Sequence, residues 1–207
     1  MTNLYYLHEW LSGFISSVKV DLFWTIASGF LLFLLKQYLD YRNDIAVRKR
    51  KISACKLLIL NESQANLDSL TSMLSMLNEI EALEKEEGEA NFSLSIREMG
   101  NEYLVGELDD KLHICRPIPH SSNDVYHKVV LDVAELSKPL FLSVQNGYEG
   151  FSMLKHIHSG LIKGLQAKQN NEPFSHNIAR SGFVEYAKNE LGRAEAKIVA
   201  LVKYCED

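Results

Sequence analysis

Apolar residues near the end of the chain recur at alternating spacings of three and four. This spacing places them on one face of an α-helix, which has about 3.6 residues per turn. Such a face needs a cover, and we predict that it packs against residues 67–77 of the same chain rather than against a copy of itself. The stripe consists of Val184, Ala187, Leu191, Ala194, Ile198, Leu201 and Cys205.

A long helix is also predicted before the middle of the chain, because residues 30–87 contain neither glycine nor proline. Gly88 then provides a stop signal, so we expect a long helix over residues 41–90. Two apolar stripes run along this predicted helix, and the second has coiled-coil-like spacing. The first is Ile45, Ile52, Cys55 and Ile59, and the second is Leu60, Leu67, Leu70, Leu74 and Leu77.

Residues 91–121 have the weakest helical pattern. They contain a short alternating segment, FSLSI, and a CRPIPHSS segment with two prolines. We predict an irregular connector here, with room for a small hairpin or one helical turn. Residues 122–207 are then expected to form a helical bundle that packs on residues 41–90, with Ser122 or Asn123 capping its first helix and Pro139 in the first turn of the next.

The N-terminal part contains an apolar block, residues 22–35, without a single charged side chain. Its fourteen residues would cover about 21 Å of a hydrocarbon layer about 30 Å thick. The flanking residues extend the apolar stretch, and Trp24 and Tyr38 lie where interfacial aromatic residues are common. We predict a transmembrane helix over residues 19–40; the alternative is a buried core helix of a soluble protein.

The residues on either side of this block predict its orientation. Residues 1–18 have an amphipathic pattern typical of a helix in the membrane interface. Basic residues follow the block, which predicts a single-pass protein of the inner (cytoplasmic) membrane, with its N-terminus outside and its body in the cytoplasm. Membrane lipid is thus an expected partner. The residues expected at lipid headgroups are Lys36, Arg42, Arg48, Lys49, Arg50 and Lys51.

Within the block, Thr25, Ser28 and Gly29 form a small-residue face. Small residues let two helices approach closely, so this face predicts packing between spans and a homo-oligomer; the alternative is a monomeric anchor. The complete fold prediction is all-α: a single transmembrane helix that continues into a cytoplasmic, antiparallel helical bundle.

Composition and motifs argue against several classes of function. A net charge of −5 disfavours direct nucleic-acid binding. Three widely spaced cysteines indicate neither a disulfide framework nor a zinc site. The common hydrolase and nucleotide-binding motifs are absent, and His156 and His158 are two residues apart rather than the four that a helical metal pair needs. The sequence predicts no cofactor, no metal site and no catalytic residue.

A membrane-anchored helical body of this outline resembles the membrane-acting effectors of prokaryotic toxin and antiviral defence modules. The resemblance is one of architecture, and it implies a protein partner that restrains the body until its release lets the spans damage the membrane. We therefore predict a non-enzymatic, membrane-anchored helical interaction protein of this kind. The alternatives are a membrane-tethered scaffold or sensor subunit that recruits a cytoplasmic partner and, third, a tethered metal-dependent hydrolase.

Overall fold

The computed structural model describes residues 2–87, 90–97, 101–108, 111–170 and 182–207. Contacts divide the chain into two compact units, Met1–Lys51 and Ile52–Asp207. Helix α1 (Thr2–Glu87) contributes to both units. Unit Ile52–Asp207, which we call the body, contains the rest of the secondary structure: β1 (Asn91–Ile96), β2 (Glu102–Leu108), β3 (Lys111–Pro117), α2 (Asp124–Leu136), α3 (Lys138–Gln169) and α4 (Phe183–Glu206).

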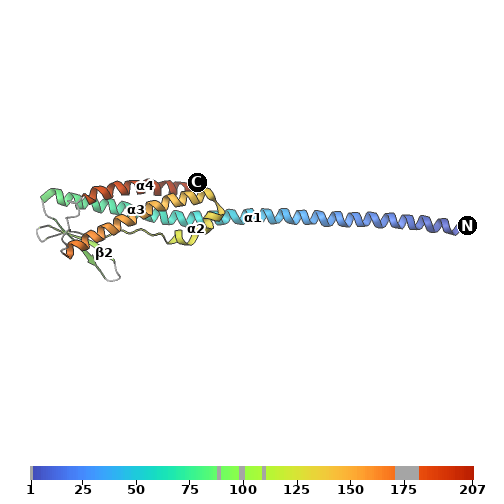
Figure 1. The fold of residues 1–207 in the computed structure, drawn as a ribbon, viewed down its shortest axis with the longest axis horizontal. Helices are drawn as coiled ribbons and strands as arrows, with labels where there is room; N and C mark the ends of the chain where they lie inside the picture. Colours follow the sequence, from blue (N-terminus) through green and yellow to red (C-terminus); the bar gives the residue numbers. More distant parts are fainter. Residues whose placement is uncertain (1, 88–89, 98–100, 109–110, 171–181) are drawn as a thin grey trace. The chain divides into compact units, whose positions relative to one another are not determined.

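The body is built around α1, α3 and α4, which lie side by side (Figure 1). Helix α4 is antiparallel to α1, because Lys56 donates to the Tyr204 carbonyl at 3.1 Å while Glu81 near the other end of the body binds Lys188. Hydrogen bonds and charge from Lys188, and then from Lys85, lower the pKa of Glu81 to about 2. These polar contacts fix the edges of an interface whose centre is apolar.

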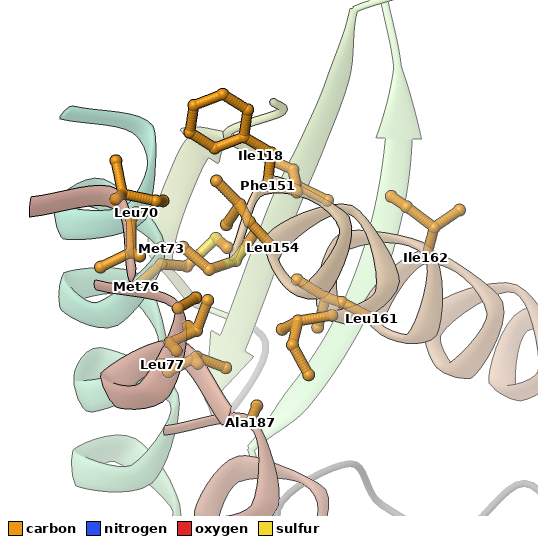
Figure 2. Close-up of a cluster of buried hydrophobic side chains, with 14 of the residues drawn as sticks. Leu70, Met73, Met76, Leu77, Ile118, Phe151, Leu154, Leu161, Ile162 and Ala187 are labelled. Carbon is orange, nitrogen blue, oxygen red and sulfur yellow. The ribbon is translucent and has the colours of Figure 1, made fainter. Parts of the chain in front are cut away.

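The core lies where the three helices meet. Leu70 and Leu77 of α1 face Leu154 and Leu161 of α3, and Ala187 of α4 lies beside them (Figure 2). The four leucine side chains are fully buried, so each contributes about 1.5–3 kcal/mol of hydrophobic stabilisation at most. Packing of this stripe, rather than helix propensity, holds the body's part of α1 in place.

Strands β1, β2 and β3 pair in this order as a three-stranded antiparallel sheet, so the prediction of an all-α fold is wrong. The strands lie in the region for which we predicted an irregular connector with room for a small hairpin. The chain is mostly helical with a small sheet. Alternation explains the difference: Phe92 and Leu94 are both buried on one face of β1, and Leu104 is the register partner of Leu94. Each segment is short on its own, but the three together complete one apolar face.

Gly106 explains how the side chains on this apolar face pack closely. It is paired with Phe92 on one side and Ile114 on the other. A side-chain carbon at Gly106 would lie 3.0 Å from the Phe92 ring and 3.3 Å from Ile114 Cβ. The missing side chain makes room for the Phe92 ring. The sheet is then attached to the helices by Gln169, which donates to the Leu94 carbonyl at 2.7 Å, and by an ion pair between Arg116 and Glu79.

No helix in the described part of the chain is long and apolar enough to cross a membrane. This finding contradicts the predicted transmembrane helix over residues 19–40, and with it the single-pass topology and the inner-membrane location. The physical weakness of that prediction is length, because the uncharged block has fourteen residues and needed its polar flanks to reach across a bilayer.

Helix α1 includes residues 2–18, but their side chains lie outside the described residues, and so does the predicted amphipathic face. Gly88, the expected stop signal, also lies outside them; α1 ends at Glu87. Further along, α2 begins at Asp124, and Ser137 caps α3 by accepting a hydrogen bond from Leu140 N at 3.4 Å. Pro139 lies in the first turn of α3, where its missing N–H breaks no helical hydrogen bond.

Candidate functional site

The first candidate site is the apolar segment, which we define as residues 22–41 of α1. Its six consecutive residues 30–35 are all about half or more exposed. Successive helical residues are about 100° apart, so these six surround the helix, and the described part of the chain covers none of its sides there. The exposed large side chains are Leu22, Trp24, Ile26, Phe30, Leu31, Leu32, Phe33, Leu34, Leu35, Tyr38, Leu39 and Tyr41.

The predicted small-residue face belongs to this segment. Thr25, Ser28 and Gly29 are exposed, and Ser28 Oγ donates to the Thr25 carbonyl at 3.0 Å. A side-chain carbon at Gly29 would meet nothing within 4 Å. The face is therefore open to an approaching helix, and its role in packing stays a prediction.

The basic residues predicted to lie at lipid headgroups are also exposed. Their contact with lipid was expected only together with the membrane span. Lys36 lies within the apolar segment, whereas the other five form a charged stretch between it and the body. The six residues are Lys36, Arg42, Arg48, Lys49, Arg50 and Lys51.

The second candidate site is a buried polar cluster around Glu62 of α1. The Glu62 carboxylate accepts three hydrogen bonds: from Ser122 Oγ and Val125 N, each at 3.0 Å, and from the Tyr148 hydroxyl. One turn further along α1, Asn66 donates to the Ser122 carbonyl at 2.8 Å and accepts from Ser122 N at 2.9 Å. Residues 62 and 66 together hold the start of α2 against α1.

Tyr148 is the member of this cluster that comes from α3. Burial raises the pKa of Tyr148, and so do the hydrogen bond and negative charge of Glu62. The hydroxyl therefore keeps its proton and remains a donor to the carboxylate. Three donors bind the two Glu62 oxygens, so the cluster stabilises a carboxylate that would be costly to bury without partners.

Sequence reasoning missed this cluster because polar residues interrupt the apolar stripes. In the structure, Ile59 of the first predicted stripe and Leu70 and Leu77 of the second belong to one buried stripe at spacings of four and three, whereas Leu60, Leu67 and Leu74 are only partly buried. The buried stripe passes through Ile59, Ser63, Asn66, Leu70, Met73, Leu77 and Ile80. The spacing alone could have identified these positions as buried, because it continues through Ser63 and Asn66 although neither is apolar.

The predicted stripe of the last helix is buried inside the body. Its neighbours include two glycines of α3: Gly147 lies against Leu201, and Gly150 lies against the Ala194 carbonyl and Ile198. The stripe thus contacts another helix of the same chain. Its buried members are Val184, Ala187, Leu191, Ala194, Ile198, Leu201 and Cys205.

The histidines and cysteines form no metal centre in the part of the chain that is described, since no group of three or more potential ligands gathers there. His158 Nε2 lies 3.2 Å from Glu102 Oε2. Burial lowers the pKa of His158, although the charge and hydrogen bond of Glu102 oppose this. The contact ties α3 to β2. All three cysteines are free thiols.

Comparison with known proteins adds no relative: no protein-family model, no curated protein and no solved structure matches the chain.

Proposed function

We propose that this chain is a non-enzymatic helical interaction protein, in which the apolar segment packs against the same segment of other copies. The observation that carries the proposal is the uncovered apolar surface on every side of residues 22–41. A helix that is apolar all round is stable in a protein when other elements surround it. The membrane-acting role expected from the sequence is not proposed, because it required a span.

Copies of the chain suit this segment for a geometric reason. One partner helix can cover only one side, whereas each helix in a symmetric assembly of three or more copies contacts two neighbours and has more of its surface covered. The small residues Thr25, Ser28 and Gly29 would allow close approach on one side. In this proposal the body is the folded part that the assembly brings together.

The test compares two double variants of adjacent leucines on the same helix. Leu31→Gln with Leu32→Gln removes apolar surface from the segment, while Leu57→Gln with Leu58→Gln removes exposed apolar surface from the body. Glutamine is a good helix former, so both variants should keep α1 intact. Sedimentation velocity of the full chain across a concentration series gives the dissociation constant of the assembly.

We expect the parent to associate and the Leu31/Leu32 variant to raise the dissociation constant at least tenfold, since each lost leucine contact is worth about 1.5 kcal/mol or more. The Leu57/Leu58 variant should behave like the parent. A parent that stays monomeric at every concentration, or equal association of the two variants, contradicts the proposal.

A further inference from the structure

A pocket of about 540 Å³ opens in the body beside the contact between Glu62 and Tyr148. Residues just before and within the start of α2 form one wall, and one face of α3 from Gln145 to Lys155 forms the other. Pockets that hold small molecules have volumes of about 300–1,000 Å³. The size therefore suits a small molecule rather than a single ion or a polypeptide segment.

Aromatic rings make up the deeper part of the lining. The Tyr126 and Tyr148 ring centroids are 4.3 Å apart at an interplanar angle of 32°, and Phe151 lies edge-on to Tyr148 at 4.4 Å. The hydroxyl of Tyr148 is held by Glu62, so this ring keeps its position whether or not a ligand is present. Tyr148 and Phe151 are buried and support Tyr126, so the half-buried Tyr126 is the ring on which a planar ligand ring can stack.

The remaining lining is polar and carries an available positive charge. The carboxamides of Asn123 and Gln145 can each donate and accept hydrogen bonds. Glu149 already binds Lys197 Nζ at 2.8 Å, so its charge is offset. Lys155 is exposed and makes no ion pair within the described part of the chain. An anionic group is what a lysine in this position would attract.

We propose that this pocket binds a small anionic molecule that carries a planar heteroaromatic ring, the chemical class of the nucleoside monophosphates. The ring would contact the tyrosines, the carboxamides would bind polar atoms at its edge, and Lys155 would bind the phosphate. This inference is independent of the apolar segment, because none of its residues belongs to residues 22–41.

The test is isothermal titration calorimetry of the full chain with the four ribonucleoside monophosphates, each titrated separately. Ribose 5-phosphate and inorganic phosphate serve as probes that lack the ring. We expect at least one nucleotide to bind one site per chain at least tenfold more tightly than ribose 5-phosphate. Binding of no nucleotide at millimolar concentration, or equal binding of ribose 5-phosphate, overturns the proposal.

Two variants test the two halves of the pocket. Lys155→Gln should weaken nucleotide binding about fivefold, as expected for one exposed ion pair. Tyr126→Leu should reduce nucleotide affinity to that of ribose 5-phosphate; circular dichroism and the thermal midpoint establish that the variant is folded. Lys163→Gln, on α3 but outside the pocket, is the matched control and should bind like the parent. Binding that neither pocket variant weakens lies elsewhere and overturns the proposal.

Discussion

Glu62 is a carboxylate in the middle of a helix–helix contact, and its surroundings explain why the fold tolerates it. A buried carboxylate without partners would cost several kcal/mol, but here three donors from two different segments satisfy it. An apolar residue would pack in the same space without selecting those donors. The charge therefore specifies which loop lies on α1, in addition to filling the space between the helices.

The first residue-scale prediction removes one donor. Tyr148→Phe keeps the ring but leaves one Glu62 oxygen buried without its hydrogen bond, so the free energy of unfolding should fall by about 1–3 kcal/mol. Urea unfolding followed by circular dichroism measures the change.

Tyr186→Phe is the matched control, because Tyr186 is an exposed tyrosine of α4. Removal of the Tyr186 hydroxyl should change the free energy of unfolding by less than about 0.5 kcal/mol. Equal stability of the two variants would mean that the Tyr148 hydroxyl does not support the buried carboxylate.

Some residues of the buried polar cluster also show which contacts cannot be predicted from the sequence. Asn66 and Ser63 occupy stripe positions that could be identified only by spacing, since their side chains are polar. Ser122, the hydrogen-bond partner of Asn66, is 56 residues away from it along the chain. No local pattern encodes such a pairing, because it depends on how the sheet returns the chain to α1.

At the scale of elements, the contact between α3 and α4 depends on small residues. A side-chain carbon at Gly147 would lie 2.8 Å from Leu201 Cβ, and one at Gly150 would lie 2.9 Å from the Ala194 carbonyl oxygen. Both neighbours belong to the backbone or lie next to it, so rotating a side chain cannot relieve the contact. The two helices approach closely because both glycines lack a side chain.

The prediction for this contact reverses the usual effect of glycine in a helix. Alanine normally stabilises a helix by about 0.5–1 kcal/mol relative to glycine. Gly147→Ala should instead destabilise the body, because overpacking costs about 1–3 kcal/mol and exceeds that gain. Thermal and urea unfolding measure whether the substitution lowers or raises the free energy of unfolding.

Gly192→Ala provides the control on α4, where an added side-chain carbon meets nothing within 4 Å. It should stabilise the protein by up to about 1 kcal/mol. If both substitutions change the free energy of unfolding in the same direction, close packing at Gly147 is refuted.

The elements differ in how well the sequence specifies them. The last helix could be predicted with its buried face, because its apolar spacing is uninterrupted from Val184 to Cys205. The sheet could not, because β1 and β2 have short alternating patterns and β3 has one buried residue, Ile114, between exposed neighbours. Strands of this length acquire their stability from pairing, which a local pattern does not show.

At the scale of the whole molecule, one helix belongs to two units with different surroundings. Between Ile52 and Glu87, α1 buries one face within the body, whereas residues 30–35 expose large apolar side chains on all sides. Helical stability in proteins comes mainly from tertiary packing. Backbone hydrogen bonds along α1 should therefore open with different free energies on the two sides of Lys51.

This difference predicts how hydrogen exchange depends on protein concentration. In the proposed assembly, amides of residues 22–41 are protected only while copies are associated, so diluting the full chain below its dissociation constant should speed their exchange. Amides of residues 59–80 are covered within the body and should exchange at the same slow rate at every concentration. Hydrogen exchange with mass spectrometry resolves the two segments in a single sample, with residues 59–80 as the internal control. Slow exchange of residues 22–41 even in the dilute sample would show that the segment is stable alone. Fast exchange at the highest concentration would show that copies of the chain do not cover it.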